Sequence, residues 1–273
     1  GKWALPVANP TGQSLYLRRC FTVMSSTPSL YQRMRTPCAQ ELDGIPWLRL
    51  LQPHARDRAV NAIHVTQANP GEYVCMIGRQ VTYWFGLIDG LLKMSSENAQ
   101  GVSMTFAGLP PGGWFGEGTA IKRESYRYNV QALRKSVVAG LHIDTFHWLL
   151  DNSLGFNRYI MNQLNERLGQ FIGAREIDRL SSPDLRVARS LAALFNPALY
   201  PYPGGNQLLR ITQQELAYLV GLSRQRVNEA LATLEAAGAI QVEYGGLRVV
   251  DLEALRNGFF QSTKSASAHE KVD

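Results

Sequence analysis

The stretch TQQELAYLVGLSRQRVNEALATLEAAG, Thr212–Gly238, contains two short helical patterns on either side of a single glycine. Thr212 and Glu215 have the spacing of a capping box, which predicts that a helix begins at this point. Gly221 suits the turn that follows, because glycine adopts a positive φ without a steric penalty. Ser223 then predicts the start of a second helix. Two helices joined in this way form a helix-turn-helix.

The second helix separates its side chains into an apolar and a polar face. Val227 and Leu231 lie on the side that the helical period turns toward the interior. Arg224, Gln225 and Asn228 occupy the first turns on the other side. In a DNA major groove, arginine can bind guanine O6 and N7, and glutamine or asparagine can bind adenine N6 and N7. The pattern therefore predicts a helix that reads bases.

The starts of both helices also suit contacts with the DNA backbone. Free N–H groups and hydroxyls at a helix N-terminus, here near Thr212 and Ser223, favour phosphate contacts that set the register on the duplex. The predicted DNA-binding residues are Thr212, Gln213, Ser223, Arg224, Gln225, Arg226 and Asn228.

A hairpin is predicted after the second helix. Ile240–Glu243 and Leu247–Val250 flank the turn signal Tyr244-Gly245-Gly246, a pattern typical of a wing. Helix-turn-helix patterns also occur in proteins that do not bind DNA, and a polar helix face is often only solvated. The cap, the glycine turn, the polar first turn and the wing together favour DNA binding.

Net charge does not decide the matter. The chain carries a formal charge of +6 and has a pI of about 9.3. Residues 1–60 contain 8 Lys/Arg and 3 Asp/Glu, a balance of +5, whereas residues 206–258 contain 5 and 6, a balance of −1. Overall basicity therefore does not mark the helix-turn-helix as a DNA reader, and the case depends on local geometry.

Several function classes have little support in the sequence. Cys20, Cys38 and Cys75 are too few for a four-cysteine iron–sulfur cluster and form no C-x-x-C pair, so no metal site or cofactor is expected. We find no defensible catalytic triad or P-loop, and we predict that the protein is not an enzyme. No apolar run is long enough to span a membrane, and the first residues do not resemble a signal peptide, so a cytoplasmic location is expected.

The rest of the chain predicts an α+β protein. Residues 1–40 lack periodicity and read as an N-terminal arm, and a helical segment is expected over 41–63. From residue 64 to about 143, short alternating runs between Gly- and Pro-rich breaks predict an antiparallel β-roll. The last residues, 259–273, have the composition of a disordered tail.

A long helix is predicted from Leu154 to about residue 180. Its apolar residues recur at three- and four-residue steps, as in the seam of a coiled coil. One reading is that this stripe packs against the protein's own roll. We favour self-association, because a helix about 40 Å long would outreach the roll. The predicted dimer interface comprises Met161, Leu164, Leu168, Phe171 and Ile172, with Ile160 on the same side.

The segment LRITQQELAYLVGLSRQRVNEALATLEAAGAI resembles the winged helix-turn-helix of the Crp/Fnr family, the catabolite activator and fumarate–nitrate regulators. The resemblance covers about residues 40–258. It implies a cyclic-nucleotide-binding-like β-roll sensor over 41–150, a dimerisation helix over 151–180 and a DNA-binding domain over 181–258. Double-stranded DNA, a second copy of the chain and RNA polymerase are the partners that it implies.

The recognition helix departs from the family at two reading positions, Gln225 and Glu229, and the second of these is often an arginine in the family. Ser223 and Arg224 match the start of the family's motif, but Gln225 replaces a glutamate. Glutamate accepts a hydrogen bond from cytosine, whereas glutamine prefers adenine. We therefore expect a half-site different from the TGTGA or TTGAT common in the family.

The stretch GWFGEG…RYNVQA resembles the family's phosphate-binding cassette. The resemblance makes Gly116, Glu117, Arg127 and Tyr128 weak candidates for effector binding, with Glu117 at a ribose hydroxyl and Arg127 at a cyclic phosphate. Tyr128 stands where cyclic-AMP binders have a small hydroxyl residue, and it would crowd the phosphate unless its ring turned outward. An alternative is that Glu117 and Arg127 only form an ion pair with each other.

These observations predict a homodimeric, sequence-specific transcription regulator on a near-palindromic operator. Its effector would be a small molecule other than cyclic AMP, or it would have none. Effector binding in the roll would act through a hinge near residues 180–184. Two alternatives remain open: a cyclic-nucleotide-responsive regulator, and a ligand-binding module whose helix-turn-helix docks a protein.

Overall fold

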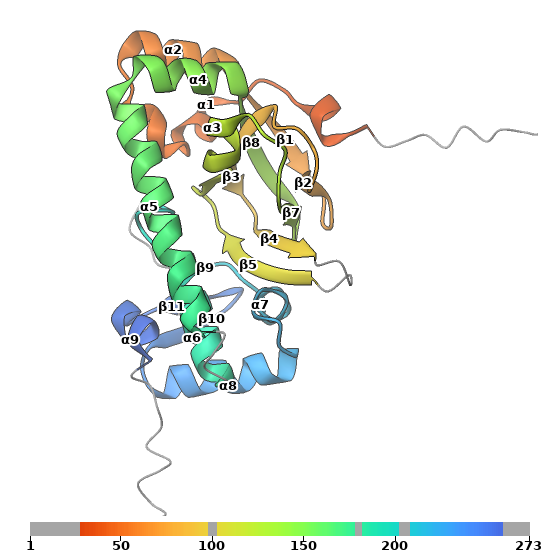
Figure 1. Cartoon of the computed structure of the whole chain (residues 1–273). Helices are drawn as coiled ribbons and strands as arrows, with labels where there is room; N and C mark the ends of the chain where they lie inside the picture. Colours follow the sequence, from red (N-terminus) through yellow and green to blue (C-terminus); the bar gives the residue numbers. More distant parts are fainter. Residues whose placement is uncertain (1–27, 98–102, 178–181, 202–207, 259–273) are drawn as a thin grey trace, which may run out of the picture.

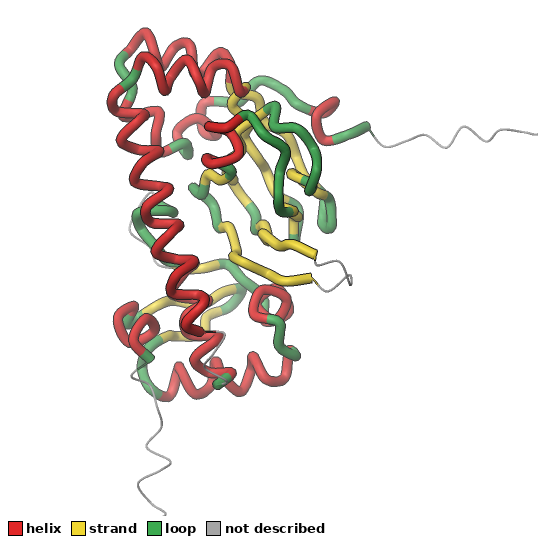
Figure 2. The backbone as a smooth tube through the Cα atoms, viewed as in Figure 1, coloured by secondary structure: helices red, strands yellow, loops and turns green. Residues whose placement is uncertain are grey.

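The computed structural model describes residues 28–97, 103–177, 182–201 and 208–258. An antiparallel β-roll leads into one long helix, which runs down to a smaller unit of helices and a short sheet (Figure 1, Figure 2). The α+β architecture predicted from the sequence is confirmed. The predicted disordered tail, 259–273, lies outside the described residues.

Two four-stranded antiparallel sheets form the roll, with strand orders β1-β8-β3-β6 and β2-β7-β4-β5. The strands are β1 Ile63–Ala68, β2 Tyr73–Cys75, β3 Tyr83–Asp89, β4 Leu92–Glu97, β5 Ser103–Leu109, β6 Trp114–Phe115, β7 Asn129–Ala132 and β8 Ser136–His142. The alternating runs read from the sequence are reproduced only in part: positions alternate in burial along β7, whereas β3 and β8 each contain four consecutive buried residues.

Four short helices precede the roll: η1 Leu30–Arg33, α1 Ala39–Asp43, η2 Pro46–Leu50 and α2 Pro53–Ala62. The single helical segment predicted over 41–63 is therefore wrong. Pro46 and Pro53 each begin a helix, because proline lacks the N–H that a helix interior needs but fits the first turn. Part of the predicted arm is docked, since Leu30 is buried and Arg35 pairs with Val65 of β1. Residues 1–27 lie outside the described residues.

Aromatic side chains fill the centre of the roll. The rings of Trp84 and Trp114 lie 4.4 Å apart between centroids, and Trp47 and Phe156 pack edge-on against them. Gly86 makes room for this cluster, because a Cβ at that position would lie 2.3 Å from the Trp114 ring. The aromatic core therefore depends on a glycine in the middle of β3.

Three helices frame the roll: α3 Glu117–Lys122, α4 Ile143–Asn152 and α5 Leu154–Ile177. The predicted long helix is confirmed as α5, which passes along the roll and reaches the C-terminal unit (Figure 1). Phe156 and Ile160 bury one side of α5 in the core of the roll. This contact fixes which face of α5 points outward.

The C-terminal unit is a winged helix-turn-helix. It contains α6 Pro183–Leu194, β9 Leu208–Leu209, α7 Gln213–Val220, α8 Arg224–Ala236, β10 Ile240–Glu243, β11 Gly246–Val249 and α9 Leu252–Asn257. The sheet order is β10-β11-β9. Thr212 and Glu215 form the predicted capping box, and Gly221 has the predicted positive φ, +65°. The predicted caps, turn and wing are confirmed.

The roll and the C-terminal unit touch directly. A Cβ at Gly108 of β5 would lie 2.7 Å from Leu194 and 2.8 Å from Leu219, so the surfaces meet at van der Waals distance. Arg134, in the turn between β7 and β8, lies 3.2 Å from the Glu215 carboxylate and donates to the Arg210 carbonyl oxygen at 2.7 Å. The capping glutamate of α7 is thereby tied to the roll, a contact that the sequence did not indicate.

Candidate nucleic-acid interface and effector cassette

The first turns of α8 are exposed. Arg224, Gln225, Arg226 and Asn228 lie at the surface, while Val227 between them is completely buried. Figure 1 shows α8 at the end of the molecule away from the roll, on the far side of α6. The polar face of the predicted reading helix is therefore free of the protein's own interior.

The starts of α7 and α8 lie next to each other. Arg224 Nε donates to the Gln213 side-chain oxygen at 3.4 Å, which joins the two helix starts. The Thr212 hydroxyl accepts from the Glu215 N–H at 3.1 Å, and the Ser223 hydroxyl accepts from the Arg226 N–H at 3.3 Å. The structure thus brings the predicted DNA-binding residues together at one end of the unit.

Glu229, which the resemblance places at a later reading position, is also exposed on this surface. Gln225 Nε2 donates to a Glu229 oxygen at 3.2 Å, and Arg226 forms an ion pair with the same carboxylate. These side chains are about half exposed, and exposed pairs of this kind contribute little to stability. Arg226 and Gln225 can therefore leave Glu229 for other partners at small cost. The spacing of Arg226 and Gln225 from Glu229, i, i+3 and i, i+4, is the sequence pattern that indicates these contacts.

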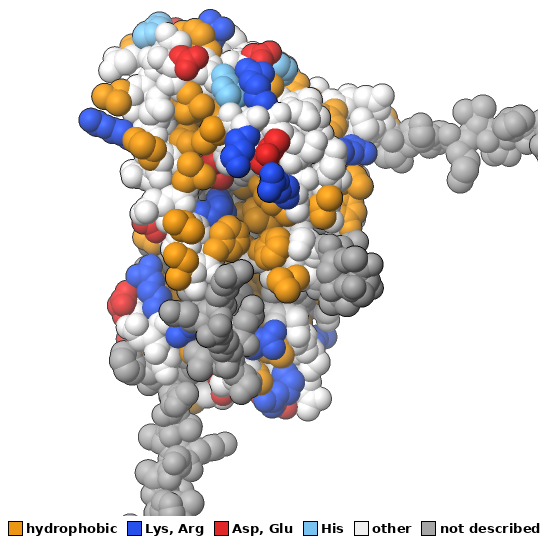
Figure 3. Space-filling view, viewed as in Figure 1, with side chains coloured by type: hydrophobic (Ala, Val, Ile, Leu, Met, Phe, Trp, Pro, Cys, Tyr) orange, Lys and Arg blue, Asp and Glu red, His pale blue; other side chains and the backbone are white. Residues whose placement is uncertain are grey.

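An apolar stripe runs along the outer face of α5. Four of its members are exposed by 37–59 %: Met161, Leu164, Leu168 and Ile172. In the view of Figure 3, apolar side chains gather along the path of α5. Exposed apolar residues in a continuous row mark a surface that binds a partner.

Two residues assigned to this stripe from the sequence contact the roll. Ile160 is 2 % exposed in the core of the roll, and Phe171 packs edge-on against Phe106 of β5, with 6.2 Å between ring centroids. The predicted placement of Ile160 is wrong, whereas Phe171 is half-buried and its place in a dimer interface stays a prediction. A helix that packs on a roll as well as on a partner needs two apolar faces, and sequence spacing alone does not separate them.

The cassette is built around Gly116 and α3. Gly116 has a φ of +90° and precedes the first residue of α3, Glu117. The Glu117 side chain is 2 % exposed and forms an ion pair at 3.3 Å with Arg167, which reaches in from α5. Arg167 also donates to the Trp114 carbonyl oxygen at 2.7 Å. The carboxylate predicted to hold a ribose is engaged by the chain's own arginine.

Arg167 is charged despite its burial. Desolvation alone lowers the pKa of its guanidinium, but the negative charge of the Glu117 carboxylate reverses this effect and raises the pKa. Removing either partner of a buried ion pair leaves an uncompensated charge in the interior. Glu117 and Arg167 are therefore held together as a pair.

Arg127 and Tyr128 also differ from the pattern of a cyclic-nucleotide site. The Arg127 side chain is 76 % exposed and pairs with Glu124 at 3.2 Å, so the alternative ion pair between Glu117 and Arg127 is wrong. Tyr128 turns inward, and its hydroxyl lies 3.4 Å from where a Cβ on Gly116 would be. Burial raises the pKa of the Tyr128 hydroxyl, which shares a hydrogen bond with Thr119.

The buried position of Arg167 was not predicted from the amphipathic pattern of α5. A polar residue between apolar positions is normally assigned to solvent, and Arg167 is adjacent to the stripe residue Leu168. Its partner is 50 positions away in the sequence. No local pattern could have indicated that pairing.

Comparison with known proteins agrees with this geometry. The profile of the cyclic nucleotide-binding domain matches residues 65–153, and that of the Crp-like helix-turn-helix domain matches residues 185–257. The chain belongs to the Crp/Fnr family of transcription regulators. As a Crp/Fnr regulator it is a DNA-binding protein and not an enzyme.

Individual relatives are distant. The chain is 26% identical over 176 residues to the transcriptional regulator SdrP of Thermus thermophilus, covering 63% of this chain and 81% of the relative. It is 28% identical over 178 residues to the cAMP-activated global transcriptional regulator CRP of Haemophilus influenzae, covering 62% and 78%. The structure of FixK2 from Bradyrhizobium japonicum has a TM-score of 0.56 at 15% identity, covering 71% and 96%. At that identity the likeness concerns the fold alone.

No helix in the described part of the chain is long and apolar enough to cross a membrane.

Proposed function

We propose that this Crp/Fnr regulator acts as a homodimer that binds a near-palindromic operator. The exposed stripe of Met161, Leu164, Leu168 and Ile172 supports self-association, since pairing of two α5 helices would remove it from water. A two-fold dimer places its recognition helices in major grooves about 34 Å apart, one helical turn. The observation that carries the proposal is the exposed polar start of α8.

Within the proposed interface the residues divide by role. Arg224, Gln225 and Asn228 read base edges from the first turns of α8. Thr212, Gln213 and Ser223 contact phosphates from the two helix starts, and Arg226 adds a charge beside them. Gln225 favours adenine where a glutamate would favour cytosine.

We also propose that no cyclic nucleotide controls the protein through the cassette. Three features support this: Glu117 is paired with Arg167, Arg127 points to solvent, and Tyr128 lies over Gly116. A cyclic nucleotide would have to displace a buried ion pair and a half-buried tyrosine. Titration of the full chain with cyclic AMP in a calorimeter is expected to give no heat of binding, and micromolar binding would overturn this part of the proposal.

Selection of bound sites from random duplexes tests the DNA-binding proposal. We expect an enriched, inverted-repeat sequence, bound with a stoichiometry of two chains to one duplex in sedimentation. Bound DNA without sequence preference at physiological salt would instead favour the second candidate, a helix-turn-helix that docks a protein. Contact with RNA polymerase is a further proposal, which transcription from the selected site in vitro would test.

A further inference from the structure

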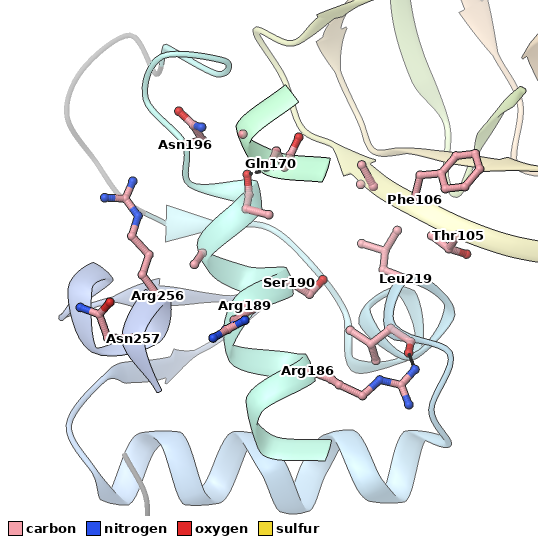
Figure 4. A pocket seen from close by; sticks show the side chains of 16 residues that line it. Thr105, Phe106, Gln170, Arg186, Arg189, Ser190, Asn196, Leu219, Arg256 and Asn257 are labelled. Atoms are coloured by element: carbon pink, nitrogen blue, oxygen red, sulfur yellow. Dashed lines mark hydrogen bonds between the residues drawn. The ribbon is translucent and has the colours of Figure 1, made fainter. Parts of the chain in front are cut away.

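A cavity of about 530 Å³ lies where the sensor part meets the DNA-binding unit. Thr105–Gly108 of β5 and Gln170 of α5 line one side, and residues of α6, α7 and α9 line the other. Figure 4 shows Arg186, Arg189 and Ser190 on α6, with Phe106 and Leu219 across from them. The volume is within the range of small-molecule sites, 300–1,000 Å³.

The lining has a one-sided charge. Arg186, Arg189 and Arg256 all border the cavity, and the lining residues that the structure describes include no aspartate or glutamate. Two of the three are partly engaged, since Arg186 Nη2 donates to the Val220 carbonyl oxygen at 2.6 Å and Arg256 forms an ion pair with Glu253 at 2.8 Å. Three guanidinium groups around one cavity make a positive site, and the planar fork of arginine suits a phosphate or carboxylate.

Two polar atoms of the lining have unused hydrogen-bonding capacity. Arg189 Nε and Gln170 Oε1 are buried and have no hydrogen-bond partner among the described residues. A buried polar group without a partner is costly, and most such groups in proteins are satisfied. One is a donor and the other an acceptor, so a ligand with an anionic group and a hydroxyl or amino group would satisfy both.

We propose that this cavity, named here the junction cavity, binds a small organic anion. Its phosphate or carboxylate contacts Arg189 and Arg256 of the C-terminal unit, and a hydroxyl or amino group of the same ligand reaches Gln170 of α5. The cassette is filled by the protein's own side chains, so the junction cavity is the site that we propose for a small ligand. The ligand would touch both sides of the junction, so it would bind one orientation of the DNA-binding unit better than others and shift the population toward it.

Titration calorimetry of the full chain with adenosine 5′-monophosphate and with citrate tests the binding step. The first probe carries one phosphate and a ring, and the second carries carboxylates only. We expect at least one of them to bind. Arg256→Gln should weaken that binding by about tenfold or more, because one charged fork is lost.

Arg127→Gln is the matched control. Arg127 and Arg256 are both exposed and both pair with a glutamate three positions earlier, so the two changes remove the same charge in the same local setting. Arg127→Gln should leave the affinity unchanged. Equal weakening by both variants, or no binding of either probe to the wild type at millimolar concentration, would overturn the proposal. Arg189→Gln, checked for folding by circular dichroism, should weaken binding at least as much as Arg256→Gln.

The regulatory step rests on the proposed DNA-binding function, and it has its own readout. Saturation with the probe that binds should change affinity for the selected operator by 5-fold or more, the usual range for coupled sites. An unchanged operator affinity would overturn the coupling. Because the binding titrations contain no DNA, failure of the junction cavity and failure of operator recognition are distinguishable.

Discussion

The recognition surface and the cassette were both predicted from short motifs, but their side chains differ in exposure and in pairing. At the start of α8, Arg224 and Asn228 are exposed, and Arg224 is held by one hydrogen bond to Gln213 at the surface. In the cassette, Glu117 is buried and paired with Arg167 from another helix. The first surface is open to a partner, and the second is occupied by the protein itself.

This difference shows which kind of site a short motif can predict. The recognition surface is local: the cap, the turn and the reading residues lie within one stretch of 27 residues, Thr212–Gly238. The cassette is not local, because its availability depends on Arg167, which lies 50 positions beyond Glu117. A motif predicts its own backbone well, but it does not predict what side chain from elsewhere fills the site.

Arg167→Ala should have the largest effect on stability. It leaves the Glu117 carboxylate buried without a partner, which should lower the free energy of unfolding by about 3–5 kcal/mol. Urea denaturation followed by tryptophan fluorescence measures this, since Trp114 lies beside the pair. Arg127→Ala, which breaks an exposed pair, should cost less than about 1 kcal/mol.

The double variant Glu117→Leu with Arg167→Met tests whether the loss comes from the unpaired buried carboxylate. Replacing both charges by apolar groups avoids the uncompensated carboxylate and should recover much of the lost stability. Equal losses for Arg167→Ala and Arg127→Ala would show that the cassette pair is no more important than a surface pair, and the contrast drawn above would disappear.

Leu164→Asp with Leu168→Asp should give the next largest effect, on assembly. Two carboxylates in the stripe would have to be buried without partners in a dimer, so we expect monomers in sedimentation velocity. Loss of one half of a two-fold reader should weaken operator binding by about 100-fold or more, or about 2.7 kcal/mol. Asn162→Asp on α5, also at an exposed position, adds charge without removing an apolar side chain. A dimer that persists in the double variant would contradict the seam.

Most of the secondary structure was predictable because its signals are local. Thr212, Gly221 and Ser223 predicted helix ends that the structure reproduces. The single helix expected over 41–63 does not form, because Pro46 and Pro53 each begin a new helix in this segment. Arg134 and Arg167 could not have been predicted, since their roles arise from contacts between elements far apart in the chain.

Arg224→Ala should have a smaller effect than loss of the dimer, confined to DNA affinity. Loss of a contact to a base should cost about 1–3 kcal/mol on the selected operator and relax the preference at one base pair. Gel shift on the operator and on its single-base variants measures both. Arg49→Ala, an exposed arginine of η2 in the sensor part, controls for net charge. Equal loss on every duplex would make Arg224 a phosphate contact and reduce the interface to non-specific attraction.

Tyr128→Phe should produce the smallest change. It tests whether the ring of Tyr128 or its hydroxyl keeps a nucleotide out of the cassette. The ring remains over Gly116 and only the hydrogen bond with Thr119 is lost, so the free energy of unfolding should fall by about 0.5–1.5 kcal/mol. Tyr244→Phe at the fully exposed tip of the wing removes the same hydroxyl from water and should change nothing. Because the ring still occupies the space, Tyr128→Phe should bind cyclic AMP no better than the wild type in calorimetry. Cyclic-AMP binding by Tyr128→Phe would mean that the hydroxyl, and not the bulk of the ring, keeps a nucleotide out.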